Sequence, residues 1–321
     1  MLGLLAATPA AFIAVALVVG LIVGSFLNVV IYRLPLMLER QWRAECAELA
    51  DSSTPAGIPT ESAAGTQADG PPAQRDPPFN LAVPRSICPA CQAPIKAIHN
   101  IPIISYLALR GRCAGCHARI SARYPAVELL CGVATAVVAW RFGFGWPAAC
   151  AAVVTWFLIS LAGIDLDHQL LPDSLTLPLL WLGLLASLSG WAAAAHGLLP
   201  VDHSLPVDPV SAIAGAAIGY AALWTVYHAF RLLTGKEGMG YGDFKLLAAL
   251  GAWLGWRMLL PIVLFAAGVG AIVGITLILA RRHRRGNPMP FGPFLAAAGW
   301  LVMMWGPQLV SSYLGLYAPR G

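Results

Sequence analysis

Residues 10–32 read AAFIAVALVVGLIVGSFLNVVIY, a stretch without a single charged side chain. A helix rises about 1.5 Å per residue and the hydrocarbon core of a bilayer is about 30 Å thick, so a run of this length is predicted to cross a membrane. No Lys or Arg precedes the run, and no small-residue cleavage site follows it. We therefore expect residues 10–32 to be a retained first transmembrane helix rather than a cleaved signal peptide.

Further long apolar runs follow along the chain, at 126–140, 147–164, 175–192, 209–230, 258–280 and about 291–317. Overall, 58% of the residues are hydrophobic and 11% are charged, whereas a soluble domain is about one quarter charged. The net charge of +5 comes from basic residues that lie between the apolar runs, so it does not indicate nucleic-acid binding. This composition predicts an all-α polytopic membrane protein.

A shorter apolar stretch, 246–256, decides how many times the chain crosses. Loops rich in Lys and Arg stay in the cytoplasm, and the basic loops here fall within 33–43, 110–123, 231–236 and 281–285. All of them lie on one side only if 246–256 also crosses, either with the help of its neighbours or buried inside the bundle. The sequence therefore predicts about eight transmembrane helices, with the N-terminus outside.

The segment between the first two spans, residues 33–125, is predicted to be cytoplasmic. Within it, residues 51–78 are rich in Pro, Gly, Ser, Thr and Ala and are predicted to be a disordered insertion. Residues 84–125 hold two C-x-x-C pairs, formed by Cys88, Cys91, Cys113 and Cys116. Four thiolates at this spacing are typical of a structural zinc site, which would stabilise a module too small for its own core.

The cysteines leave two other interpretations open, a dithiol redox pair and thiols without a ligand. Cys46, Cys131 and Cys150 lie outside the pattern, and we expect the last two to be small apolar side chains within spans. The remaining chain, 126–321, is predicted to form the membrane core of about seven helices.

Acidic side chains near membrane depth are costly, so they are candidates for function. Asp165 and Asp167 lie at the end of one apolar run, in GIDLDHQLLPD, and Asp243 precedes another, in GMGYGDFK. Peptide hydrolysis by carboxylates needs two of them sharing a water, one accepting its proton while the other donates to the carbonyl. Ordinary structural roles are also open, because Asp173 and Asp243 could cap helices and Asp167 could be a solvated loop acid.

Together with the cysteine module, these two segments resemble the bacterial type IV prepilin peptidases, membrane aspartyl proteases of the G-x-G-D class. Further shared motifs are GSFLNVV at 24–30, RLP at 33–35, SICPAC at 86–91, NIP at 100–102, LRG at 109–111, ISARYP at 120–125 and VELL at 127–130. The resemblance selects Asp165, seven residues before Pro172, and Asp243 of the Gly-x-Gly-Asp-x-Lys segment as the catalytic pair.

The resemblance implies a function as well. Such an enzyme cleaves the short basic leader from prepilins and from type II secretion pseudopilins, at the cytoplasmic face of the bacterial inner membrane. It also implies methylation of the new N-terminus with S-adenosylmethionine, although no glycine fingerprint locates the residues that bind this cofactor. We further hypothesise that Asp167, Asp173 or Glu128 attracts the charges of the leader.

Two other classes of function are considered. A proton- or ion-coupled transporter with a zinc-stabilised cytoplasmic cap would place its acids near the bilayer midplane, whereas Asp165 and Asp243 fall at predicted cytoplasmic ends. A non-catalytic scaffold would explain the cysteines but not a pair of aspartates. Other protease chemistries lack their motifs, since the chain has neither H-E-x-x-H nor G-x-S-x-G.

Overall fold

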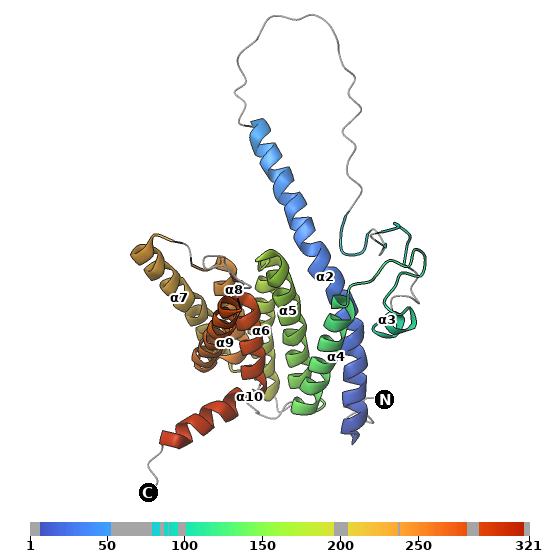
Figure 1. The fold of residues 1–321 in the computed structure, drawn as a ribbon. Coiled ribbons are helices and arrows are strands. Elements are labelled where there is room, and N and C mark those ends of the chain that lie inside the picture. Colours follow the sequence, from blue (N-terminus) through green and yellow to red (C-terminus); the bar gives the residue numbers. More distant parts are fainter. Residues whose placement is uncertain are drawn as a thin grey trace, which may run out of the picture.

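The computed structural model describes residues 7–52, 79–83, 87–88, 90–95, 101–195, 205–236, 238–280 and 289–317. It is built from helices (Figure 1): α2 Pro9–Ser52, α3 Ile104–Ala108, α4 Arg123–Phe142, α5 Trp146–His168, α6 Asp173–Ala195, α7 Pro209–Thr234, α8 Tyr241–Leu254, α9 Leu259–Leu279 and α10 Gly292–Tyr317. A 3-10 turn, η2, Trp256–Met258, joins α8 to α9. The described residues contain no β-strand, only two isolated β-bridges. The predicted disordered insertion beyond Ser52 lies outside the described residues.

Within the described part of the chain, seven helices are long and apolar enough to cross a membrane: α2, α4, α5, α6, α7, α9 and α10. They coincide with the seven long apolar runs of the sequence, which confirms the all-α polytopic prediction. The first helix continues well past the predicted end of its span, so that its second half projects from the bundle (Figure 1).

Helix α8 is the eighth predicted crossing, and it is short. Its 14 residues span about 21 Å, less than the hydrocarbon thickness. From Asp243 to Leu254, every residue except Lys245 is buried, because α6, α7 and α10 surround the helix. The structure thus has this segment enclosed in the bundle, one of the two arrangements predicted.

Small residues let α7 approach α8 closely. A Cβ atom added at Gly215 of α7 would lie 2.2 Å from the carbonyl oxygen of Gly251, and one added at Gly251 would lie 2.1 Å from that of Gly215. The two backbones therefore touch, as they do in small-residue contacts between membrane helices. This contact holds α8 against its neighbour.

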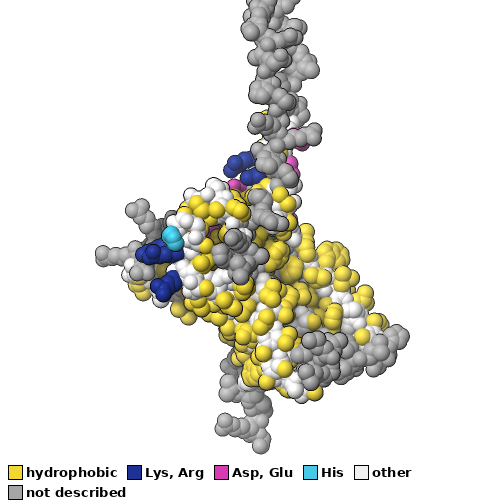
Figure 2. Space-filling view, turned by 90° about the vertical axis from the view of Figure 1, so that its right-hand side faces the viewer, with side chains coloured by type: hydrophobic (Ala, Val, Ile, Leu, Met, Phe, Trp, Pro, Cys, Tyr) yellow, Lys and Arg dark blue, Asp and Glu magenta, His cyan; other side chains and the backbone are white. Residues whose placement is uncertain are grey.

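Large apolar side chains cover the outside of the bundle, and Figure 2 shows them over most of the visible membrane region. On α9, Leu260, Leu264 and Ile272 are all more than 60% exposed. A continuous apolar surface of this kind suits contact with lipid tails rather than water. Cys131 and Cys150 are buried among the spans, as predicted.

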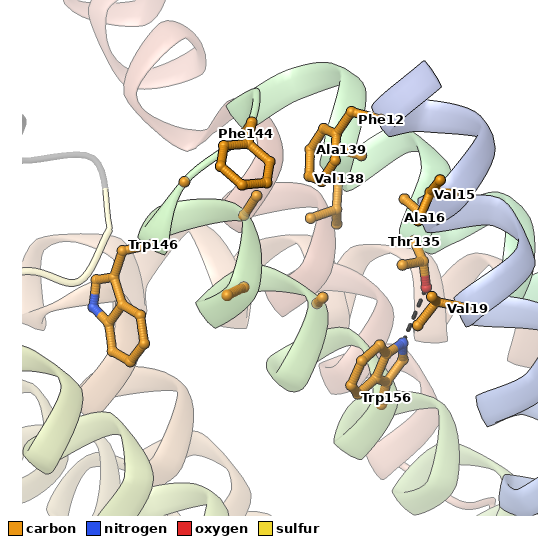
Figure 3. A pocket seen from close by; sticks show the side chains of 14 residues that line it. Phe12, Val15, Ala16, Val19, Thr135, Val138, Ala139, Phe144, Trp146 and Trp156 are labelled. Atoms are coloured by element: carbon orange, nitrogen blue, oxygen red, sulfur yellow. Dashed lines mark hydrogen bonds between the residues drawn. The ribbon is translucent and has the colours of Figure 1, made fainter. Parts of the chain in front are cut away.

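An apolar cavity of about 480 Å³ opens between α2, α4 and the beginning of α5 (Figure 3). Phe12, Val15 and Trp146 are among its lining residues. The Nε1 of Trp156 donates a 3.0 Å hydrogen bond to Oγ1 of Thr135, so the cavity offers few free polar groups. It lies at the start of α5, whereas Asp165 lies at the end of that helix.

Candidate active site

Asp165 and Asp243 meet inside the bundle although 77 positions separate them in the sequence. Asp165 stands in the last turn of α5 and Asp243 in the first turn of α8. Both are buried, with 5% and 6% of their surface exposed, and the carboxylates are close enough to interact electrostatically. Asp167 and His168, the next acid and the histidine on α5, are exposed instead.

The carboxylate of Asp165 accepts a hydrogen bond from the start of another helix. The backbone N–H of Gly292, the first residue of α10, donates to Oδ2 of Asp165 at 2.9 Å in a buried contact. A Cβ atom at position 292 would lie 2.6 Å from the same oxygen, so only glycine fits without a shift. No sequence motif predicted a role for Gly292; the one local signal is the Pro290-Phe291-Gly292-Pro293 segment ahead of the last apolar run.

The carboxylate of Asp243 has a different environment. Its Oδ1 is inaccessible and has no hydrogen-bond partner among the described residues. The next side chain, Phe244, is fully buried. A buried polar atom without a partner is costly and uncommon in folded proteins, and such atoms often belong to functional sites.

Leu171 packs between the segments that carry the two aspartates. It belongs to the loop between α5 and α6 and is buried. A Cβ atom added at Gly242 would lie 2.6 Å from Cβ of Leu171, and one added at Gly292 would lie 3.2 Å from its Cδ1. Leu171 therefore contacts both Gly242, which precedes Asp243, and Gly292, which is hydrogen-bonded to Asp165. Because neither glycine has a side chain, this one leucine sets the spacing between α8 and α10.

Two ion pairs flank the aspartates. Arg123 of α4 contacts Asp167 at 2.5 Å and donates to the carbonyl oxygen of Gly163 at 3.4 Å, on either side of Asp165. Lys245 of α8 contacts Asp173 of α6 at 2.6 Å. These ion pairs link the helix ends that carry Asp165 and Asp243 to neighbouring helices.

The same contacts bear on the hypothesis that acids near the site attract the leader. Asp167 and Asp173 each have a cation of this chain as partner. Glu128 is buried, and its carboxylate accepts a 2.8 Å hydrogen bond from the backbone N–H of Ile103. All three acids therefore make contacts within the protein, and their attraction for the leader stays a hypothesis.

The four predicted zinc ligands come together in one cluster. The Sγ atoms of Cys88, Cys91, Cys113 and Cys116 all lie within 4.8 Å of one another. Those of Cys88 and Cys116 are 3.8 Å apart. A tetrahedral zinc ion with Zn–S bonds of about 2.3 Å holds its sulfur ligands about 3.8 Å apart. The donor set and its spacing therefore fit such an ion.

Both C-x-x-C pairs adopt the same turn. The N–H of Gln92 donates to the carbonyl of Cys88, and that of His117 donates to the carbonyl of Cys113, at 2.8 and 3.0 Å. Gln92 and His117 share the left-handed conformation, with φ of 59° and 57°. The matching turns direct both thiols of each pair at one point, as a metal knuckle requires.

The thiols differ in acidity. Hydrogen bonds from the backbone of Cys116 and Gly115 lower the pKa of Cys113 to about 6. A backbone hydrogen bond from Ala118 acts in the same direction on Cys116, but hydrogen bonds with the neighbouring thiols, Cys91 first among them, and desolvation outweigh it and raise the pKa of Cys116 to about 11. Thiolate is the form that binds metal, so the backbone favours a metal ligand at Cys113.

Two family models match most of the chain. The bacterial peptidase A24 N-terminal domain matches residues 18–142, and the type IV leader peptidase family matches residues 152–275. The chain belongs to the type IV leader peptidase family. Proteins named prepilin leader peptidase/N-methyltransferase are 48% identical to it in Stutzerimonas stutzeri, 50% in Aeromonas salmonicida and 46% in Pseudomonas aeruginosa.

These alignments span 97%, 95% and 98% of this chain and 96%, 95% and 97% of the relatives. No solved structure matches it. Membership of this family, together with the apolar helices, identifies a multi-pass protein of the inner membrane. The comparisons support the peptidase interpretation and not the transporter alternative.

Proposed function

We propose that this protein removes the leader peptide of type IV prepilins and type II secretion pseudopilins and methylates the new N-terminus. The relatives named for these two activities align along nearly its whole length. The observation that carries the proposal is the meeting of two buried carboxylates, Asp165 and Asp243, inside a member of a peptidase family. These two aspartates are the proposed catalytic residues.

In the proposed reaction, the two carboxylates hold one proton between them before the peptide binds, because two close like charges do not ionise together easily. The ionised carboxylate takes a proton from water, and the resulting oxygen attacks the scissile carbonyl carbon. The other aspartate gives its proton to the carbonyl oxygen, which forms a gem-diol. When the C–N bond breaks, the first aspartate passes its proton to the leaving nitrogen, and the second regains one from a gem-diol hydroxyl.

The position of the pair suits a substrate anchored in the membrane. Asp165 and Asp243 lie where helices end or begin, and the start of α10 lies beside them. The apolar helix of a prepilin can pack against the spans while its basic leader reaches this end of the bundle. We assign that end to the cytoplasm, because the basic loops of the sequence cluster between the corresponding helix ends.

Zinc is the metal proposed for the site formed by Cys88, Cys91, Cys113 and Cys116. With four thiolate ligands it would have no open position for water, so its role there is to hold the module together. S-adenosylmethionine is the proposed methyl donor and would supply the group transferred to the new amine. No residues are assigned to its binding.

The proposal is tested with purified protein in detergent, a prepilin and S-adenosylmethionine, and the products are identified by mass spectrometry. We expect the pilin to lose its leader and to gain the mass of one methyl group. Omission of S-adenosylmethionine should leave a cleaved pilin without the added mass. An intact prepilin after incubation with folded protein would overturn the proposal.

A further inference from the structure

At the start of α10, one backbone N–H that has no partner within the helix donates a hydrogen bond to Asp165. In the first turn of a helix the N–H groups lack partners within the helix. Here Pro293 has no N–H, while the N–H groups of Phe294 and Leu295 both reach the carbonyl of Phe291 at 3.1 Å. The N–H of Gly292 points the other way and bonds to Oδ2 of Asp165.

We propose that Gly292 is a positioning residue of the catalytic centre: its N–H makes Asp165 the carboxylate that takes the proton from water, which leaves Asp243 to protonate the scissile carbonyl. This inference rests on the proposed function and goes beyond it, because it gives each aspartate its own role. It also makes the start of α10 a third component of the site, beside α5 and α8.

The two carboxylates lie in different environments. A hydrogen bond from an N–H to a carboxylate stabilises the ionised form and is stronger than a bond between neutral groups. Asp243 has one oxygen buried without a partner among the described residues, and that environment suits a carboxyl group that carries the proton.

The sequence of the turn fits this role. Glycine at 292 is needed because a Cβ atom would fall 2.6 Å from Oδ2 and 3.1 Å from Cγ of Asp165. Proline is well suited to the first turn of a helix, where its missing N–H costs nothing. Leu171, packed against position 292 and against Gly242, fixes the turn relative to α8.

The roles give a balanced reaction. Asp165 begins as the carboxylate and Asp243 as the acid. Water gives one proton to Asp165 while its oxygen bonds to the carbonyl carbon, and Asp243 protonates the carbonyl oxygen. Asp165 then protonates the leaving nitrogen as the C–N bond breaks, and a gem-diol hydroxyl returns a proton to Asp243. Both aspartates finish in their starting forms, ready for another peptide.

Other charged groups near Asp165 are shared by all variants of the test and do not confound it. On its own helix these are Asp167 and His168, with Arg123 of α4 paired to Asp167. On the elements packed against it they are Asp243 and the Lys245–Asp173 pair.

The test removes the Gly292 donor in two ways. In one variant, Gly292→Ala, the added Cβ atom displaces the Asp165 carboxylate from its hydrogen bond. In the other, glycolic acid replaces Gly292 through nonsense suppression, so that an ester oxygen takes the place of the N–H and no side-chain atom is added. Gly268→Ala, where nothing lies within 4 Å of the added carbon, controls for the first variant. The same ester at Ala296, inside α10, controls for the second.

We expect both Gly292 variants to lower kcat for prepilin cleavage about tenfold to a hundredfold with KM little changed. The melting temperature in detergent should stay little changed for the ester variant, which adds no atom. Both controls should retain kcat within about twofold. Retention of kcat by the ester variant would overturn the inference, as would equal losses for the esters at 292 and 296. The proposed function is judged separately: it fails if the unchanged protein leaves the prepilin intact, or if Asp165→Asn and Asp243→Asn still cleave.

Discussion

Replacing Gly242 by alanine adds one carbon to the contact between the first turn of α8 and Leu171. The new Cβ would lie 2.6 Å from Cβ of Leu171 and 3.3 Å from its Cδ1 and carbonyl oxygen. Carbon atoms in contact stay about 3.5 Å apart or more, so the two segments must separate by about 1 Å. Leu171 is buried and has little room to yield.

The neighbouring residue, Asp243, would move with the backbone of Gly242. A misplacement of about 1 Å at a reacting group costs roughly a hundredfold in rate, equivalent to about 2.7 kcal/mol of activation free energy. Overpacking of this kind also lowers the free energy of unfolding by about 1–3 kcal/mol. We therefore expect Gly242→Ala to fold but to cleave prepilin about a hundredfold more slowly.

The assay measures initial rates of prepilin cleavage by purified Gly242→Ala protein, with melting temperatures recorded in the same detergent. Gly268→Ala is the matched control, because its added carbon meets open space within the described residues. A rate for Gly242→Ala within about threefold of the unchanged protein would refute the packing argument. A large loss for both variants would show that alanine in a helix, and not the Leu171 contact, is responsible.

Three further outcomes are expected. Lys245→Met and Asp173→Asn should each destabilise the protein by about 1 kcal/mol or less, because their ion pair is partly exposed, and the double variant should lose no more than either single one in thermal unfolding. Purified protein should hold one zinc ion by elemental analysis and Cys88→Ser should hold less, whereas an equal loss in Cys131→Ser would contradict the assignment. Glu128→Ala should lower the unfolding free energy by about 1–3 kcal/mol, since it leaves the N–H of Ile103 without its buried acceptor, and an unchanged melting temperature would count against that contact.

Features with a local signature could be predicted from the sequence. The long apolar runs and the two C-x-x-C pairs each depend on neighbouring residues, so the seven candidate spans and the cysteine cluster agree with the prediction. The short stretch at 246–256 was harder, because its length does not fit the bilayer. Its place in the bundle depends on the glycine contact with α7, which hydropathy does not report.

Contacts between distant residues were not predicted. The hydrogen bond from Gly292 to Asp165 joins positions 127 residues apart. Its donor is a backbone N–H, so no side chain in the sequence indicates it. The acids at 167 and 173 look like free surface charges in the sequence, and only the packing of α4 and α8 provides Arg123 and Lys245 as their partners. The choice of Asp165 and Asp243 as the catalytic pair came from the family resemblance and stays a prediction.

The most direct test compares the initial rates of prepilin cleavage by Asp165→Asn, Asp243→Asn and Asp167→Asn, each purified as a folded protein in detergent. Loss of a general acid or base costs about 10²–10⁴-fold in rate, so the first two variants should fall by at least that much. Asp167→Asn, whose side chain is exposed and paired with Arg123, should stay within a few-fold of the unchanged protein. Normal rates for Asp165→Asn and Asp243→Asn would contradict the account, because cleavage would then need neither carboxylate.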